Sequence, residues 1–400
     1  MASLKILFIC NKSPWPAKEG GPVAMSNLID GLITAGNKIK VLAVNSDKYF
    51  VNVSDIPATY RIETDIEFVH IDLNVKTFSA FLNLFSQQSY HVQRFISKAF
   101  EEKLIEILLK DNFDIVQMET LFMAPYIDVI RKYSEAKILL RSHNIEHLIW
   151  KRMYLTCKNP LKKFYLHHLF VTLEKYEKTV PCYFDGILPI TEKDAGFFKY
   201  HSRKPVRTIP FGVNMENYPV QKTPPEEQSL FHIGAMNWKP NEEGIRWFLK
   251  NVWPQIYPKL PGLKLYLAGR AMPRRLLDLN QKNVSVLGEV PDARAFILSK
   301  NIAIVPLFSG SGVRIKIIES MSLGKTVIST KTGAEGIDYT AGENIIIADT
   351  ADEFATAIGR LYNNRDEAAR IGKNARRLME EKHENQKIIQ RLQAFYQEIL

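Results

Sequence analysis

The chain has 400 residues, of which 46% are hydrophobic and 24% charged, and its formal net charge is +10. This length exceeds one ordinary hydrophobic core and indicates two domains, while the composition, with neither a low-complexity tract nor a solenoid repeat, is that of a globular protein. No segment approaches eighteen consecutive apolar residues, which argues against a membrane-spanning helix, and the positive charge predicts an acidic partner.

The first apolar run, Lys5–Cys10, predicts a buried strand, because it is too short for the core of a signal peptide and no small-residue cleavage site follows it. Cys10, Cys157 and Cys182 are widely spaced and form no Cys-x-x-Cys pair, which is typical of reduced thiols. We therefore expect a cytoplasmic protein.

Short apolar runs alternate with longer segments of helical period through the first half of the chain. This alternation predicts a parallel sheet with crossover helices, since the strands of such a sheet are buried on both faces. The predicted strands are Lys5–Cys10, Lys38–Val44, Glu67–Ile71, Asp114–Met118, Lys137–Arg141, Gly186–Ile190 and Val206–Ile209, and the helices between them include Val23–Ala35, Ser97–Lys110, Ala124–Tyr133 and Leu161–Thr179.

The segment Pro210–Asn214 ends this series, and Pro219–Pro225 is polar and rich in proline, so we place a domain boundary after residue 212. The alternation then restarts, and two Rossmann-like domains facing across a cleft would bind a ligand there, at the carboxyl ends of their strands. The predicted strands are Leu230–Ile233, Leu263–Ala268, Val284–Leu287, Ile302–Pro306, Thr326–Thr330 and Asn344–Ile347; the helices are Glu242–Trp253, Ala293–Ser299, Lys316–Leu323 and Ala351–Asn363, and from Arg365 onward the chain is strongly helical.

Gly20 and Gly21 follow the first predicted strand and open a helix. Without Cβ atoms they let the backbone approach a ligand, and a helix N-terminus offers unpaired N–H groups to an anion. The alternative is a tight turn without a ligand. The pair is not a Gly-x-Gly-x-x-Gly motif and no acidic residue stands at the distance that would hold a ribose, which disfavours a nicotinamide site.

A second glycine-rich segment, Ser309–Glu319, follows a predicted strand and leads straight into a helix. Arg314 and Lys316 add two cations within one turn of the helix N-terminus, an arrangement that suits a diphosphate. Glu319, one turn into the helix, could accept two hydrogen bonds from a ribose diol. The alternative is a Lys316–Glu319 pair on a solvent-exposed helix face. The loop residues predicted to bind the donor are Gly310, Ser311, Gly312 and Val313.

His143 follows a predicted strand of the first domain, where it could hydrogen-bond a sugar hydroxyl or a phosphate; the alternative is a satisfied loop residue. His147, one turn into the next helix, is a second candidate. Neither a Gly-x-Ser-x-Gly elbow nor a His-Glu-x-x-His motif occurs, so the sequence indicates neither a serine hydrolase nor a zinc site of that type.

The stretch Trp150–Cys182 carries seven Lys or Arg residues against two Glu, with six aromatic residues interleaved. A basic aromatic helix can lie on an anionic membrane surface, so peripheral contact with the cytoplasmic face of the membrane is one expectation. A solvated helix whose aromatic residues face the core is the other, and both stay open.

Several motifs of the second domain resemble family 4 glycosyltransferases: Gly-Ala-Met-Asn-Trp-Lys-Pro-Asn at 234–241, Leu-Ala-Gly-Arg at 267–270, Val-Leu-Gly-Glu-Val at 286–290 and the segment 309–337. Ile-Pro-Phe-Gly-Val-Asn at 209–214 is similar to the family's interdomain segment. The resemblance covers essentially the whole chain. It implies the GT-B architecture, a nucleoside-diphosphate sugar donor, transfer with retention of configuration, and no required metal or other cofactor.

The resemblance also implies a role for each part of the chain. Residues 1–212 would form the acceptor-side domain and 213–380 the donor domain, and a helix over 381–400 would cross back to pack on the first domain. Gly20 and Gly21 would face the donor phosphates and the acceptor, and His143 would lie near the transferred sugar. Leu287 and Gly288 would lie against the nucleobase.

Three features of the family pattern differ in this chain. The usual pattern has two glutamates eight positions apart; Glu319 matches the second, which would hold the ribose, and Ser311 stands at the first. Arg314 replaces a common glycine, and the usual phosphate-binding Arg and Lys after the second domain's first strand give way to Met236-Asn237-Trp238-Lys239. We therefore expect Arg314 and Lys316 to serve as relocated phosphate charges, with Asn237 and Lys239 of that segment beside the donor.

The sequence as a whole predicts a hexosyl-transferring, retaining glycosyltransferase that moves a sugar from a nucleotide-sugar donor to a glycan or lipid-linked acceptor in polysaccharide or glycolipid biosynthesis. Nucleic acid is not among the expected partners. The alternatives are a nucleotide-sugar epimerase and a nucleotide-sugar-binding protein without catalysis. An epimerase would need a base at the sugar carbon, and Ser311 is a poor one.

Overall fold

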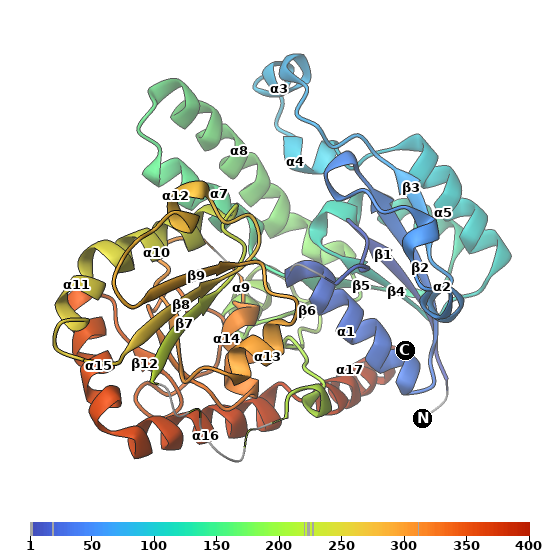
Figure 1. The fold of residues 1–400 in the computed structure, drawn as a ribbon. Coiled ribbons are helices and arrows are strands. Elements are labelled where there is room, and N and C mark those ends of the chain that lie inside the picture. The colour runs from blue at the N-terminus through green and yellow to red at the C-terminus, as the bar shows by residue number, and fades with distance from the viewer. Residues whose placement is uncertain (1–2, 18–19, 220, 222–224, 226–227, 311) are drawn as a thin grey trace. The chain divides into compact units, whose positions relative to one another are not determined.

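The computed structural model describes residues 3–17, 20–219, 221, 225, 228–310 and 312–400, and Ser311 of the predicted donor loop therefore lies outside the described residues. The chain divides into two compact units: unit 1 comprises Met1–Gly212 and Asn385–Leu400, and unit 2 comprises Val213–Glu384. Each unit contains its own six-stranded parallel sheet with connecting helices (Figure 1). The predicted α/β class with two Rossmann-like parallel sheets is confirmed.

Unit 1 has the sheet order β3-β2-β1-β4-β5-β6. Its strands are β1 (Lys5–Cys10), β2 (Lys38–Asn45), β3 (Glu67–His70), β4 (Ile115–Glu119), β5 (Lys137–Ser142) and β6 (Gly186–Pro189). Its α-helices are α1 (Gly20–Thr34), α2 (Ala58–Thr64), α3 (Thr77–Asn83), α4 (Tyr90–Gln93), α5 (Lys98–Lys110), α6 (Ile127–Tyr133), α7 (Glu146–Thr156), α8 (Pro160–Thr179), α9 (Glu192–His201) and α17 (Asn385–Ile399).

Unit 2 has the sheet order β12-β11-β10-β7-β8-β9. Its strands are β7 (Ser229–Ile233), β8 (Lys264–Ala268), β9 (Val284–Gly288), β10 (Ile302–Val305), β11 (Thr326–Ser329) and β12 (Ile346–Ile347). Its α-helices are α10 (Lys239–Asn251), α11 (Trp253–Ile256), α12 (Arg274–Leu277), α13 (Ala293–Leu298), α14 (Ile315–Ser322), α15 (Ala351–Asn363) and α16 (Arg365–Lys382).

Strand β1 lies in the middle of its sheet, paired with β2 at Ile9↔Leu42 and with β4 at Ile9↔Met118. Successive side chains of a strand point to opposite faces. Leu7 and Ile9 accordingly pack in the core that contains α5, while Phe8 packs in the core that contains α1 and α17. Because both faces are covered, the strand is apolar after Lys5, and this apolar run is the pattern that predicted a strand from the sequence.

Helix α17, at the end of the chain, completes the second of these cores. Ile389, Leu392, Phe395 and Tyr396 recur at helical spacing and are buried against α1 and the sheet (Figure 1). A Cβ on Gly31 of α1 would lie 2.6 Å from Ile389 Cγ1, so the two helices approach too closely for a side chain at that position. The C-terminal helix is therefore part of the hydrophobic core of unit 1.

The chain passes from unit 1 to unit 2 after Gly212 and returns before Asn385. In unit 1, Asn27 Nδ2 donates to Gly212 O at 2.7 Å, and Asn385 Nδ2 donates to Asn27 O at 2.9 Å. In unit 2, the Val213 N–H donates to His383 O at 2.7 Å. The two points where the chain changes unit are therefore each stabilised by hydrogen bonds. The helical C-terminal segment consists of two helices, α16 and α17, and the second change of unit lies between them.

One predicted strand is wrong: Val206–Ile209 forms no strand, and only Val206 makes an isolated parallel bridge, to Ile187. The segment still bonds to β6: the Ile187 N–H donates to Pro205 O at 2.9 Å, and the N–H groups of Arg207 and Ile209 donate to Ile187 O and Pro189 O at 3.0 and 2.9 Å. A second bridge would need an N–H on Pro189 of β6, which proline lacks, so the ladder does not continue. The other predicted strands are observed within two residues of their expected ends.

We predict that Phe395→Ala lowers the unfolding free energy of unit 1 by about 3–5 kcal/mol, because it leaves a cavity between α17 and the sheet. Tyr200→Ala is the matched control, since Tyr200 is 85% exposed whereas Phe395 is 1% exposed. Urea denaturation followed by circular dichroism measures both, and the control should stay within about 0.5 kcal/mol of the parent. Equal stabilities of Phe395→Ala and the parent would contradict the burial of α17.

Candidate functional site

In unit 2, the segment between β10 and α14 passes through two backbone conformations that favour glycine. Gly310 has a φ of +100° and Gly312 a φ of +79°. A Cβ on Gly310 would lie 2.8 Å from the indole ring of Trp238 and 3.1 Å from Arg314 Nη2. Both glycines of the predicted donor loop are thus required by the backbone, and the loop lies against the segment that follows β7. Val313, the next loop residue, is half-buried.

Arg314 is the N-cap residue of α14 and is only 5% exposed. Its guanidinium carbon lies 5.3 Å from the centre of the Trp238 ring, and Nη1 donates to Gly312 O. The side chain is therefore fixed at the start of the helix. The Arg314 cation lies at the positive end of the helix dipole, which is electrostatically unfavourable. An anion bound there would be stabilised by the cation and by the dipole.

Lys316 is half-buried, and its amine points inward beneath the same loop. Its Nζ donates to Asn241 Oδ1 at 2.6 Å and lies 3.2 Å from His232 Nε2. The other ring nitrogen of His232, Nδ1, lies 2.9 Å from Ile304 O, which can only accept. The proton of His232 therefore sits on Nδ1, and Nε2 accepts from Lys316.

Two opposing effects set the charge of this lysine. Burial, followed by the positive charge of Arg314, lowers the pKa of Lys316 to about 7, although Glu319 opposes the change. Burial and the charge of Lys316 lower the pKa of His232 well below its ordinary value. The alternative expected from the sequence, a Lys316–Glu319 ion pair on a solvent-exposed face, is wrong, because Lys316 points into the unit and bonds to Asn241.

Glu319 lies one turn into α14 and is hydrogen-bonded by Tyr218, whose hydroxyl donates to Oε1 at 3.2 Å. Burial raises the pKa of Glu319, while the Tyr218 hydrogen bond and the charge of Arg294 oppose this. The guanidinium of Arg294, on α13, lies 4.7 Å from the Tyr218 ring. Sequence reasoning missed Tyr218 and Arg294, because they reach Glu319 from distant segments.

The carboxyl ends of β7, β8 and β9 come close together through glycines. Gly269, at φ +145°, could carry no Cβ without overlapping Gly234 O, and its N–H donates to Gly288 O at 2.7 Å. Leu287 is 48% exposed at this edge, as a residue that contacts a planar base would be. The predicted nucleobase positions thus lie at the same edge of the sheet as the strand ends.

Asn237 and Lys239 lie on the segment that follows β7, on either side of Trp238, and both are exposed. Lys239 is the first residue of α10. Since Trp238 packs on Gly310, the structure brings these two predicted donor residues next to the predicted donor loop.

In unit 1, His143 follows β5 and is paired with a carboxylate that the sequence analysis did not identify. His143 Nε2 lies 2.6 Å from Glu119 Oε2, and Glu119, the last residue of β4, is fully buried. Burial raises the pKa of Glu119, but the hydrogen bond and charge of His143, together with Arg141, bring it below its ordinary value. Glu119 is therefore ionised and fixes His143 through Nε2.

A chain of buried polar groups supports this pair. Gln117 Nε2 donates to Glu119 Oε1 at 2.6 Å, and the Tyr396 hydroxyl of α17 donates to Gln117 Oε1 at 2.6 Å. Arg141 Nε lies 3.7 Å from Glu119 Oε2. The signal in the sequence was the pair Gln117 and Glu119, two polar residues on one face of a strand that is otherwise apolar.

The predicted glycine pair, Gly20 and Gly21, forms the start of α1. A Cβ on Gly21 would lie 3.1 Å from Cε and 3.3 Å from Nζ of Lys12, so the absence of a side chain there leaves room for this lysine. Lys12 Nζ also lies 4.7 Å from the centre of the Tyr49 ring. The structure thus adds a cation beside the helix start that the sequence analysis had not singled out.

His147, the second histidine candidate, has a structural role. It is 3% exposed, and its Nδ1 lies 2.7 Å from Glu177 Oε2. Glu177 also accepts from the backbone N–H groups of Glu146 and His147. Burial and the charge of Glu177 raise the pKa of Glu146 to about 8, so this carboxyl is protonated near neutral pH.

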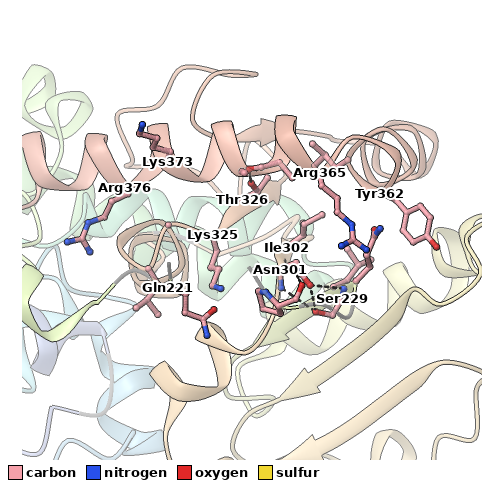
Figure 2. A pocket seen from close by; sticks show the side chains of 18 of the residues that line it. Gln221, Ser229, Asn301, Ile302, Lys325, Thr326, Tyr362, Arg365, Lys373 and Arg376 are labelled. Atoms are coloured by element: carbon pink, nitrogen blue, oxygen red, sulfur yellow. Dashed lines mark hydrogen bonds between the residues drawn. The ribbon is translucent and has the colours of Figure 1, made fainter. Parts of the chain in front are cut away.

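Unit 2 also contains a cavity of about 650 Å³, whose lining side chains are shown in Figure 2. It is lined by Ser229, Ile302 and Thr326, the first residues of β7, β10 and β11, and by Lys325 and Arg365. Ligands of parallel sheets bind at the carboxyl ends of strands, which is the opposite end. None of the predicted donor-binding residues lines this cavity.

The described part of the chain contains no group of three or more His, Cys, Asp or Glu side chains that could hold a metal ion. Nor does any helix among the described residues have the length and apolar character needed to cross a membrane.

Comparisons with known proteins agree on the fold. Residues 227–364 match the family model described as Glycosyl transferases group 1. Sucrose-phosphate synthase from Thermosynechococcus elongatus superposes with a TM-score of 0.71 over 99% of both chains at 16% identity. HepE from Anabaena, solved in complex with UDP-glucose, superposes with a TM-score of 0.66 over 99% of this chain and 100% of its own, also at 16% identity. The fold is therefore GT-B, with two Rossmann-like domains.

A sequence relative spans nearly the same length. An uncharacterized 44.6 kDa protein in the cps region of Klebsiella pneumoniae is 24% identical over 96% of this chain and 97% of its own length. The similarity to group 1 glycosyltransferases in the family model covers residues 227–364 of this chain.

The low pKa of Lys316 predicts a pH dependence of stability. An unfolded lysine titrates near pH 10.4, so between about pH 7 and 10.4 the unfolded chain binds a proton that the folded chain does not, and stability rises with pH. We predict that the unfolding free energy of the parent rises relative to that of Lys316→Met by about 1 kcal/mol per pH unit from pH 7.5 to 9.5. Denaturation at three pH values measures this.

The control is Lys373→Met, because Lys373 is an exposed residue of α16. The unfolding free energy of Lys373→Met should change with pH in the same way as that of the parent. A constant difference between the parent and Lys316→Met across this range would contradict the burial of the Lys316 amine.

Proposed function

We propose that the protein is a retaining glycosyltransferase that moves a hexose from a nucleoside-diphosphate sugar to a glycan or lipid-linked acceptor, in polysaccharide or glycolipid biosynthesis. The observation that carries this proposal is the arrangement of Gly310, Gly312, Arg314 and Lys316 at the carboxyl ends of β7 and β10. The group 1 match over residues 227–364 and the UDP-glucose bound by HepE support it.

The diphosphate is proposed to bind at the start of α14. An anion beside Lys316 favours its ammonium form and would raise its lowered pKa, so ligand binding charges the residue where it is needed. Arg314, already fixed by Trp238 and Gly312 O, needs no reordering to meet the phosphates. With two cations at the helix start, we propose that no metal is required.

The rest of the nucleotide is proposed to follow the strand ends. Tyr218 holds Oε1 of Glu319, and Oε2 is the atom assigned to the ribose diol. Leu287 and Gly288 would lie against the base. Asn237 and Lys239 would lie beside the phosphates. Ser311 belongs to the same loop in the sequence.

In the proposed transfer, the departing diphosphate accepts the proton of the acceptor hydroxyl on the same face of the sugar. No pair of carboxylates is then needed, unlike in glycoside hydrolysis. The protein positions the substrates and stabilises the charge that grows on the leaving phosphate. His143, held through Nε2 by Glu119, is proposed to contact the transferred sugar with its other nitrogen, and Gly20 and Gly21 to leave space for donor phosphates and acceptor.

We further propose that the protein works in the cytoplasm at the periphery of an anionic membrane, without nucleic acid as a partner. The net charge of +10 supports an acidic surface as partner.

Incubation with radiolabelled UDP-, GDP- and ADP-sugars and with isolated glycan and lipid fractions tests the activity. Transfer of label with an unchanged anomeric configuration supports the proposal. Isomerised donor without transfer would instead identify an epimerase, and binding without turnover a protein that has lost catalysis; either result would overturn the proposal.

We predict that Arg314→Ala lowers turnover by about 30- to 1000-fold, because a charge-assisted hydrogen bond to the leaving phosphate contributes about 2–4 kcal/mol in the transition state. Arg314→Lys should recover only part, since the planar two-donor geometry is lost. Arg365→Ala, in the cavity at the other end of the strands, is the matched control and should keep parental turnover. Parental turnover in Arg314→Ala would show that the diphosphate does not bind beside Arg314.

Glu119→Gln removes the charge behind His143 while keeping the size of the side chain. We predict a fall in kcat of about 10- to 100-fold with little change in donor KM, because Glu119 orients His143 rather than binding the nucleotide. Tyr396→Phe, which removes only the hydrogen bond to Gln117, should have a smaller effect. Steady-state kinetics measure kcat and the donor KM of each variant. An unchanged kcat in Glu119→Gln would contradict a role of His143 in the transfer.

A further inference from the structure

Helix α3 of unit 1 turns its large apolar side chains toward solvent. Phe78 is 73% exposed, Phe81 57% and Leu82 51%, whereas the buried residues of this helix are Ala80 and Asn83. A helix of a globular protein normally buries its large apolar residues and exposes its small and polar ones. The opposite arrangement in α3 indicates a surface that is covered when the protein works.

Neighbouring segments extend this apolar exposure. Phe85, just beyond α3, is 79% exposed, and its ring centre lies 5.6 Å from that of Phe81. Leu155 at the end of α7 is 62% exposed, and Leu161 and Phe164 at the start of α8 are 82% and 68% exposed. Helices α7 and α8 pack together as a hairpin that brings these ends close (Figure 1).

The C-terminal part of α3 contacts α8. Asn83 Oδ1 is 3.1 Å from His168 Nε2, and Ala80 packs in one cluster with Leu166. Phe164 precedes His168 by one helical turn and so lies on the same face of α8. The exposed side chains of both helices therefore lie near this contact. We define the α3–α8 surface as Phe78, Phe81, Leu82, Phe85, Leu155, Leu161 and Phe164.

The sequence had drawn attention to the aromatic residues of Trp150–Cys182, and the structure places most of them elsewhere. Phe170 is buried, and Trp150, Tyr154, Tyr165 and Tyr176 pack against the cores of unit 1. The expectation of core-facing aromatics thus holds for these five, and Phe164 is the exception.

In the two segments that carry the exposed apolar residues, the charged side chains are all Lys or Arg. Residues 73–100 and 148–173 contain no Asp or Glu. The same two segments contain eight Lys or Arg residues: Lys76, Arg94, Lys98, Lys151, Arg152, Lys158, Lys162 and Lys163. Lys151, Lys158 and Lys162 are exposed. A second copy of the chain would present the same cations and repel, whereas an anionic bilayer complements both the charge and the apolar rings.

We propose that the α3–α8 surface docks unit 1 on an anionic lipid bilayer, with its phenylalanine rings inserted at the headgroup boundary. This inference rests on the proposed peripheral membrane contact and names its surface. It uses none of the residues assigned to the donor or to the transferred sugar, so it can be tested separately from the transfer activity.

The test is co-sedimentation of the full chain with vesicles of phosphatidylcholine alone or with 30% phosphatidylglycerol. We expect binding to the anionic vesicles at 0.1 M salt and at least a fivefold weaker partition coefficient at 0.5 M, because salt screens exposed charges. Phe81→Ser/Phe85→Ser and Lys158→Glu/Lys162→Glu should each lower the partition coefficient about tenfold or more.

The matched control is Ile62→Ser/Leu109→Ser, which removes two apolar side chains that are 80% and 70% exposed on α2 and α5. It should bind anionic vesicles like the parent. All variants should keep the parental melting curve, nucleoside-diphosphate binding and transfer to soluble acceptors.

The proposal is overturned if the parent ignores anionic vesicles at 0.1 M salt, or if the surface variants bind them as well as the control does. A parental dimer in sedimentation velocity that Phe81→Ser/Phe85→Ser dissociates would assign the surface to a second copy instead, and would also overturn it. Vesicle binding in a protein that transfers no sugar would refute the proposed activity while leaving the docking surface intact.

Discussion

Lys316 Nζ lies 2.6 Å from Asn241 Oδ1 and 3.2 Å from His232 Nε2, and the candidate site of unit 2 depends on this partly buried contact. It ties the first turn of α14 to α10 and to β7. The position of α14 in turn fixes the glycine loop before it and holds Arg314 against Trp238. Arg314 and the Lys316 amine then share the positive end of a helix, and charging this amine costs free energy until an anion arrives. Such a conflict between local electrostatics and fold is typical of a binding site.

Unit 1 places a buried carboxylate at the corresponding end of its sheet. Glu119 pairs with His143, and its other oxygen is held by Gln117, which Tyr396 of the C-terminal helix holds in turn. Because α17 also fills the core beside α1, the end of the chain contributes both to the stability of unit 1 and to the orientation of His143. One face of α17 thus contributes both to the hydrophobic core of unit 1 and to the hydrogen bonds that lead to His143.

Most strands could be predicted from the sequence, because a strand buried on both faces is a continuous apolar run such as Lys5–Cys10. The exception, Val206–Ile209, lies beside Pro189 of β6, which has no N–H to continue the ladder after the bridge between Ile187 and Val206. The donor loop was visible because its glycines and cations are adjacent in sequence. The partner of His143 was not, since Glu119 is 24 residues away, and Tyr396 is 279 residues from Gln117. The outward rings of α3 were also hidden, because exposure depends on tertiary packing.

The most direct test of the account is hydrogen–deuterium exchange with saturating UDP, GDP or ADP. A diphosphate at the start of α14 should slow amide exchange in residues 312–319 and in 235–241, the segment that carries Trp238, because the bound ligand would stabilise both segments against local opening. The account predicts protection in these two segments for at least one nucleotide. Protection confined to residues 323–326 and 361–377, around the cavity at the other end of the strands, would contradict it.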